Sequence, residues 1–282
     1  MQSILFKFGP VAIRMYGLMM ALGFIAGWNV LSWLCRREGR RPELFTNLLM
    51  LMMVSGVVGA RIAYVIEHWR AEFANNLMEI VRVDHGGLMF YGGLILAFIC
   101  FVAYCLAKRE RFLPMADLLA VVVPLGHAFG RVGCFFNGCC YGKLTNGPFG
   151  VSFPANSPAW NEQAHLGLLP ATAVRALPVL PTQLFEAAGC IAIFVVLLFA
   201  YLKLNRPAVD GRMQPKERAG VVAAVYLASY GVMRFLMEML RGDPRAAVMG
   251  LSIGQTISLG VFAAGVMFAV AAYRRGSGGA AR

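Results

Sequence analysis

The sequence has few charged residues. Only 14% of its 282 residues are Asp, Glu, Lys or Arg, and 59% are hydrophobic. A soluble globular chain is about a quarter charged and about half apolar, so this chain has too little water-facing surface to be one. The composition excludes a cytosolic enzyme, a coiled coil, a disordered tail and a disulfide-stapled secreted module. It predicts an integral membrane protein. The net charge of +12 is then explained by basic loops on the cytoplasmic side of the membrane, and not by binding to nucleic acid.

The sequence also lacks the common motifs of nucleotide binding and covalent catalysis. It contains no Walker A loop, HExxH, GxSxG or dinucleotide-binding fingerprint. No residue stands out as a protein nucleophile. Either the chain performs no covalent catalysis, or the nucleophile arrives with a substrate.

Seven long apolar runs are present instead. A membrane-spanning helix needs about 20 mostly apolar residues, and the runs lie at about 12–34, 44–66, 88–107, 115–134, 182–202, 219–240 and 253–273. The first is too long for a removable signal peptide, contains Arg14 and has no cleavage site after it. We expect one all-α, seven-helix membrane domain over residues 1–282, with an arm at 67–87 and an irregular cap, or head, at 135–181 as insertions.

The basic residues predict the orientation. Of the 26 lysines and arginines, 15 lie in the loops and the tail on one side of the predicted helices, and the positive-inside rule places this side in the cytoplasm. We therefore expect the N-terminus, the arm and the head on the periplasmic side, and the C-terminus on the cytoplasmic side.

Four arginines lie toward the outer ends of the predicted helices, where a charge costs at least ~2.5–3.5 kcal/mol. They are Arg61, Arg131, Arg234 and Arg241. The side chain of an arginine near a helix end commonly extends to the membrane interface. This is the simplest interpretation for Arg241, whereas for Arg61 the sequence favours neither this interpretation nor a functional role. Glu238, four residues after Arg234, can neutralise it within the helix, and Tyr230 lies on the same stripe. Two guanidinium groups in one outward-facing cavity would suit a phosphate, because the planar fork matches that anion.

The seven cysteines include three near the predicted head, Cys134, Cys139 and Cys140. Zinc sites usually take four Cys or His ligands at defined spacings, and no histidine has such a spacing to these three. We therefore expect no metal site. The sequence leaves a disulfide between Cys134 and either Cys139 or Cys140 as an alternative. A disulfide between Cys139 and Cys140 is not expected, because adjacent cysteines seldom pair with each other.

Six segments carry a family resemblance, in this order: IRMYGLMMALGF, GARIAYVIE, GGLMFYGGLI, GHAFGRVGCFFNGCCYG, LPTQLFEA and YGVMRFLMEMLRGDPR. Together they cover nearly the whole chain, which resembles the prolipoprotein diacylglyceryl transferases. The resemblance implies an enzyme that moves the diacylglyceryl group of phosphatidylglycerol to the thiol of a lipobox cysteine and releases glycerol 1-phosphate. The acceptor thiol would then be the missing nucleophile, attacking as the thiolate.

The resemblance also implies roles for single residues. Arg131 and Arg234 would bind the headgroup and stabilise the departing phosphate, with Tyr230 beside Arg234 as a further catalytic residue. The remaining residues expected to line or brace the lipid site are Tyr16, Arg61, Asn137, Gly138 and Glu238.

Two positions depart from the family pattern. Tyr91 stands where many members have a histidine discussed as a base, so we expect a catalytic position there and leave the base open. The chain reads Asn137-Gly138-Cys139-Cys140-Tyr141 where many members read Asn-Gly-Glu, which we take as the mark of a branch with GCCYG.

The expected partners are phosphatidylglycerol, a prolipoprotein signal peptide with a lipobox cysteine, and membrane lipids. We expect no nucleic acid, no cofactor and no metal. We expect a monomeric, multi-pass protein of the bacterial inner membrane with its active site toward the periplasmic leaflet. Three alternatives are a phosphatidylglycerol-using transferase with another acceptor, a redox protein using Cys139 and Cys140, and a transporter. The last would usually show half-helices or repeats, which are not visible.

Overall fold

The protein is almost entirely helical. The computed structural model describes residues 4–8, 11–74, 76–82, 86–170, 172–205, 219–242, 247–248 and 250–278. Within these residues, seven helices are long and apolar enough to cross a membrane. They are α1 (Met15–Arg37), α2 (Pro42–Glu67), α3 (Phe90–Ala107), α4 (Phe112–Asn137), α6 (Thr182–Leu204), α7 (Val221–Leu240) and α8 (Ile253–Gly278).

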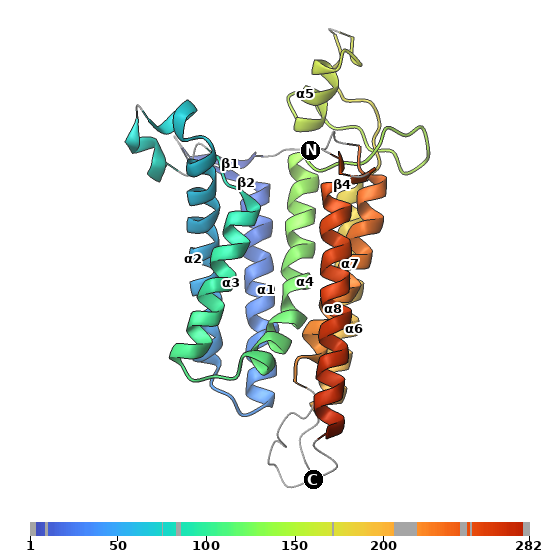
Figure 1. Cartoon of the computed structure of the whole chain (residues 1–282). Coiled ribbons are helices and arrows are strands. Elements are labelled where there is room, and N and C mark those ends of the chain that lie inside the picture. The colour runs from blue at the N-terminus through green and yellow to red at the C-terminus, as the bar shows by residue number, and fades with distance from the viewer. Residues whose placement is uncertain are drawn as a thin grey trace. The chain divides into compact units, whose positions relative to one another are not determined.

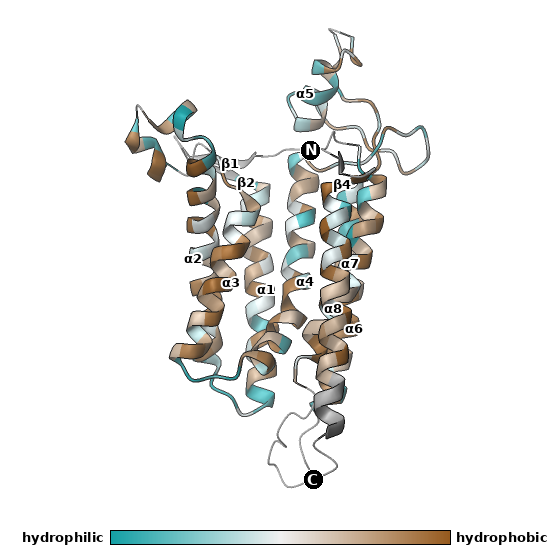
Figure 2. Cartoon of the chain, viewed as in Figure 1, coloured by the Kyte–Doolittle hydropathy of each residue, from teal (hydrophilic) through white to brown (hydrophobic). Residues whose placement is uncertain are grey.

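The seven helices confirm the expected fold class, and each overlaps one of the expected apolar runs. Figure 2 shows the apolar colouring along their length and the more hydrophilic colouring of the head and the connecting loops. The orientation in the membrane stays a prediction. Residues 206–218, which carry several of the basic residues used to predict it, lie outside the described residues.

The chain divides into two compact units. The larger unit contains residues 1–30 and 116–282, and the smaller unit contains residues 31–115. The helices α1 and α4 pass from one unit to the other. The expectation of a single domain stays a prediction, and each unit is described by itself.

In the smaller unit, α2 and α3 pack side by side (Figure 1). The two backbones approach closely, because a Cβ atom on Gly59 would lie 2.5 Å from the carbonyl oxygen of Gly92. Small residues at such a crossing allow van der Waals contact between helices in a membrane. Leu34, Leu48 and Phe101 are buried in this unit.

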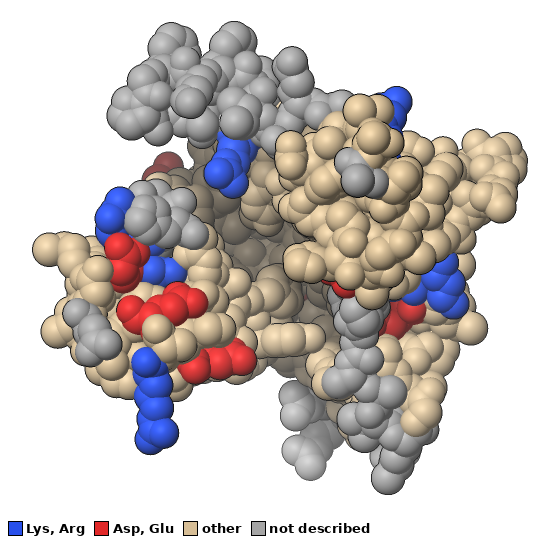
Figure 3. Space-filling model, turned by 90° about the horizontal axis from the view of Figure 1, so that it is seen from above, with Lys and Arg blue, Asp and Glu red and all other residues tan. Residues whose placement is uncertain are grey.

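The arm expected at 67–87 follows α2. Its described part contains a short π-helical segment, η1 (Trp69–Phe73), and a 3₁₀ segment, η2 (Leu77–Val81). Acidic and basic side chains both gather at this end of the smaller unit (Figure 3). Leu77 and Met78 are exposed, so the arm also presents apolar surface.

The larger unit is built on α4, α6, α7 and α8. Leu118 and Val121 of α4 and Cys190 and Leu197 of α6 are buried, which places the apolar core of this unit between these helices. The carboxylate of Asp117, also buried, accepts backbone hydrogen bonds from the start of α7. This carboxylate satisfies amides that would otherwise lack partners at a helix start.

The expected head begins inside α4, because that helix continues to Asn137 before the irregular chain starts. The head contains one short helix, α5 (Pro158–His165), whose start is capped by the Ser157 hydroxyl. Phe153 and Val179 form part of its own small apolar core. Two pairs of short strands complete the structure: β1 (Ile4–Phe8) with β2 (Val11–Arg14), and β3 (Ala247–Val248) with β4 (Leu251–Ser252), both antiparallel.

Candidate functional site

Two of the predicted arginines meet on one buried carboxylate. Glu186, on α6, has a relative exposure of 2%. Its Oε1 lies 3.1 Å from Nη2 of Arg131, and its Oε2 lies 3.7 Å from Nη1 of Arg234. The structure therefore brings Arg131 of α4 and Arg234 of α7 together on opposite oxygens of one acidic group.

An imidazole and two phenol rings lie beside this group. Arg131 Nε lies 3.1 Å from His127 Nε2, and the same imidazole nitrogen lies 3.4 Å from Glu186 Oε1. The His127 ring is 5.6 Å from the ring of Tyr230, which is 5.8 Å from that of Tyr226. Tyr230 thus lies near the arginines, as predicted, in the aromatic part of the site.

A second carboxylate holds Arg234 from its own helix. Glu238 Oε2 lies 2.8 Å from Arg234 Nη2, which confirms the expected pair at i and i+4. The Ser252 hydroxyl donates to Glu238 Oε1 at 3.0 Å. A Cβ atom on Gly254 would lie 2.6 Å from the same carboxylate, so the beginning of α8 packs directly against it. A negative charge is favourable at a helix N-terminus, and Glu238 is therefore fixed as a support for Arg234.

A third arginine is buried close to this pair. Arg241, which ends α7, is buried, and its charge interacts with that of Arg131. The arrangement suits an anionic ligand such as a phosphodiester, because guanidinium groups bind phosphate oxygens with forked hydrogen bonds.

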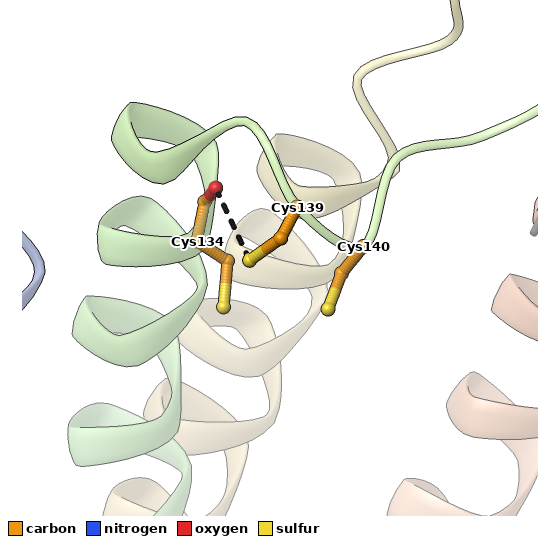
Figure 4. A group of neighbouring side chains, drawn as sticks. All are labelled: Cys134, Cys139 and Cys140. Atoms are coloured by element: carbon orange, nitrogen blue, oxygen red, sulfur yellow. Dashed lines mark hydrogen bonds between the residues drawn. The ribbon is translucent and has the colours of Figure 1, made fainter. Parts of the chain in front are cut away.

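Three cysteine side chains lie close together at the end of α4, and the Cys139 thiol donates to the backbone carbonyl oxygen of Cys134 at 3.8 Å (Figure 4). Cys134 lies in the last turns of the helix, Cys139 and Cys140 follow it, and the three sulfur atoms lie within 4.8 Å of one another. All seven cysteines are free thiols, so the bridge that the sequence left open is not formed in this structure. Hydrogen bonds from the other two thiols, together with the charges of Arg241 and Arg131, lower the pKa of the Cys140 thiol below its ordinary value.

Three further predicted residues gather around these cysteines. Tyr16 of α1 lies within electrostatic range of Arg131 and of all three sulfur atoms. The Asn137 side chain hydrogen-bonds to the Cys139 thiol. Gly138 has φ +72°, a left-handed conformation that reverses the chain after α4. Their contribution to lipid binding stays a prediction.

The two predicted residues of the smaller unit have different surroundings. All five N–H donors of the Arg61 guanidinium are directed at backbone carbonyls, and the group lies over the rings of Tyr64 and Phe73. The acceptors are the carbonyl oxygens of Glu79, Ile80, Arg82, Gly86 and Gly87. Arg61 therefore holds the arm against α2. Tyr91 is exposed on α3, and the expected roles of both residues stay predictions.

Sequence reasoning missed Glu186 and His127 as members of this site. Glu186 is an acidic residue inside the fifth apolar run, so the argument that singled out the arginines applied equally to it. His127 lies four residues before Arg131, one helical turn away on the same face.

Most of the chain is similar to proteins of one known family. A family model described as "Prolipoprotein diacylglyceryl transferase" matches residues 3–271. A phosphatidylglycerol–prolipoprotein diacylglyceryl transferase of Clostridium tetani is 35% identical over 92% of this chain and 93% of its own length. The protein of the same name from Vibrio atlanticus is 31% identical over 97% of this chain and 91% of its own. Both relatives are thus similar to this chain over nearly their full length.

Proposed function

This chain belongs to the prolipoprotein diacylglyceryl transferase family, and from that premise we propose how its residues carry out the family reaction. It is a transferase that moves the diacylglyceryl group of phosphatidylglycerol to the thiol of the lipobox cysteine in a prolipoprotein, the first step of lipoprotein maturation. Glycerol 1-phosphate is the second product. The observation that supports this proposal best is the meeting of Arg131 and Arg234 on Glu186.

Arg131 and Arg234 bind the phosphodiester of phosphatidylglycerol. They come from different helices, so their guanidinium groups can contact the phosphate from two directions. When the acceptor thiolate attacks the glyceryl carbon, the carbon–oxygen bond breaks and negative charge develops on the departing phosphate oxygen. Donors already oriented toward that oxygen stabilise the transition state more than the ground state.

The carboxylates position these arginines. Glu186 holds Arg131 and Arg234 near each other while no lipid is bound, and Glu238 holds Arg234 against the start of α8. Without them, two buried guanidinium groups would repel each other in a medium of low dielectric constant. Tyr230 lies next to the arginines and completes this wall of the lipid site.

Tyr16, Asn137 and Gly138 line the end of the site from which the acceptor enters. Supporting this placement, Tyr16 and Asn137 neighbour the loop that follows α4, where Gly138 turns the chain. In the proposed orientation this end faces the periplasmic leaflet of the bacterial inner membrane, because the basic loops lie on the cytoplasmic side. The protein acts as a monomer.

The test uses the purified full chain, phosphatidylglycerol vesicles and a synthetic peptide with a lipobox cysteine. The wild type is expected to add the mass of a diacylglyceryl group to the peptide. Arg131→Ala and Arg234→Ala variants should insert and remain folded but lose at least about 10²-fold in rate, the usual effect of removing one transition-state donor. Arg175→Ala, at an exposed position of the larger unit, is the matched control and should keep the wild-type rate.

Two results would contradict the proposal. Normal lipidation by both arginine variants would show that the arginine pair is not the headgroup site. A wild-type protein that consumes phosphatidylglycerol but leaves every cysteine peptide unmodified would favour a different acceptor.

A further inference from the structure

The cysteine cluster has no task in the reaction as proposed above. Its sulfur atoms come from Cys134, Cys139 and Cys140 and converge in one place (Figure 4). The other four cysteines of the chain lie within helices and serve as small apolar residues. Three convergent thiols next to a phosphate site form an arrangement that packing alone does not require.

The sulfur positions suit a thiophilic metal ion. A zinc–sulfur bond is about 2.3 Å, so the sulfurs of a tetrahedral site lie about 3.8 Å apart. The observed separations, all within 4.8 Å, need to shorten by no more than about 1 Å to reach that value.

The backbone that carries the sulfurs is already held in place. Gln183 Nε2 donates to the carbonyl oxygen of Cys139 at 2.8 Å, and Thr182 Oγ1 donates to that of Cys140 at 3.0 Å. Cys140 itself has φ +61°, a conformation that costs a non-glycine residue energy. These contacts hold the loop in the form that brings both of its sulfur atoms within 4.8 Å of that of Cys134.

The donor set and the local charge favour Zn²⁺. Thiolates are soft ligands that select Zn²⁺ or Cu⁺ over Mg²⁺ or Ca²⁺. Three thiolates and one Zn²⁺ carry a net charge of −1, and Arg131 and Arg241 lie within electrostatic range of Cys140 to compensate it. Among the residues that the structure describes, the cluster contains three ligands and no fourth. Three protein ligands with one open position are typical of catalytic zinc sites.

In place of the expectation from sequence that no metal binds here, we propose that Cys134, Cys139 and Cys140 bind one Zn²⁺ and that the thiol of the lipobox cysteine takes the open position. This inference rests on the proposed function, because it names the group that activates the acceptor. A metal-bound thiol is deprotonated, and its proton goes to solvent. The sulfur lone pair then forms the bond to the glyceryl carbon, and the electron pair of the broken carbon–oxygen bond moves to the phosphate oxygen facing Arg131 and Arg234. The activation needs no side-chain base, which fits a chain that has Tyr91 at the family's histidine position.

The first experiment measures bound metal. The full chain is purified in detergent without oxygen, incubated with Zn²⁺ and freed of excess metal before elemental analysis. We expect one zinc ion per chain. A variant with Cys134, Cys139 and Cys140 changed to Ala should contain none, whereas the matched control with Cys100, Cys105 and Cys190 changed to Ala should keep it.

If the triple variant does not fold, bound zinc is measured instead on a single Cys140→Ser variant, which retains two of the three sulfur atoms. Its zinc occupancy should fall well below one. The proposal is overturned by wild-type protein that binds no zinc, or by a disulfide among these three cysteines in the protein isolated without oxygen.

The second experiment tests the open position without lipid. Co²⁺ replaces Zn²⁺, and the sulfur-to-cobalt charge-transfer absorption is followed while peptide is added. A lipobox peptide with cysteine should strengthen the band as a fourth thiolate binds, and the same peptide with serine should not. An unchanged spectrum with the cysteine peptide overturns the assignment of the fourth position.

The third experiment separates this inference from the proposed function. An ordinary thiol with pKa ≈ 8.5 is only about 3% thiolate at pH 7, so loss of metal activation should lower the transfer rate by up to about 30-fold. The deficit of the triple variant should shrink as the pH rises through that pKa. Wild-type transfer by the zinc-free variant at pH 7 overturns the inference and leaves the proposed function standing. Zinc and peptide binding by a wild type that transfers nothing would instead refute the proposed function.

Discussion

Replacing Glu186 by Gln tests the electrostatic design of the arginine site. The substitution keeps the shape of the side chain but removes the charge that Arg131 and Arg234 share. The pairs lie at 3.1 Å and 3.7 Å, and all three side chains are at least four-fifths buried. With an effective dielectric constant of about 20, the gross attractions are about 5 and about 4.5 kcal/mol.

The net loss is smaller than these attractions because burying the charges costs desolvation energy. Removing one partner of a buried ion pair typically costs about 3–5 kcal/mol, which corresponds to a fall in Tm on the order of 10 °C for a chain of this size. Phosphatidylglycerol should offset part of that loss, since its phosphate supplies the missing negative charge between the two arginines. A zwitterionic lipid should not.

Thermal unfolding of the purified protein provides the measurement, in detergent with either phosphatidylglycerol or phosphatidylcholine added. We expect the Glu186→Gln variant to lose stability in both mixtures, with the smaller loss in phosphatidylglycerol. Glu43→Gln, at an exposed position, is the matched control and should leave Tm unchanged in both. The reasoning is refuted if Glu186→Gln melts with the wild type, or if its loss is the same size in the two lipids.

Three other variants test single contacts. Gly254→Ala places a methyl group 2.6 Å from the Glu238 carboxylate, so peptide lipidation should fall at least about 10-fold, whereas Gly260→Ala, which meets open space, should not change it. Arg61→Ala removes five hydrogen bonds to backbone carbonyls, and limited proteolysis should then cut the arm faster; an unchanged rate of cutting would contradict its structural role. Asp117→Asn weakens the cap on α7 and should cost about 1–2 kcal/mol of stability in thermal unfolding, an expectation that an unaltered Tm would contradict.

The membrane fold could be predicted because its cause is local. Length and hydropathy decide whether a segment spans a bilayer, and each of the seven apolar runs became a helix. The ends were less predictable. The helix α4 continues to Asn137, three residues beyond the expected run, because hydropathy marks an apolar stretch and not the residue at which a helix ends. The division into two compact units depends on contacts between helices, which periodicity does not reveal.

The candidate site could be predicted only in part, for a similar reason. A charge within an apolar run is visible in the sequence, so Arg131 and Arg234 could be selected by their cost in the membrane. Their meeting on Glu186 depends on the rotation and depth of α4, α6 and α7, which no single run specifies. The chain reversal at Gly138 and Cys140 brings the cysteines together, although their spacing in the sequence gave no sign of a shared site.

The two carboxylates of the arginine cluster also bear on turnover. Phosphatidylglycerol carries one negative charge, whereas glycerol 1-phosphate is a phosphate monoester with a second pKa near 6 and carries close to two negative charges at pH 7. In the proposed site the product therefore brings an additional negative charge next to Glu186 and Glu238, which are buried, so that the repulsion is only weakly screened. Besides holding the two arginines together, the carboxylates should then weaken the binding of the product relative to that of the substrate.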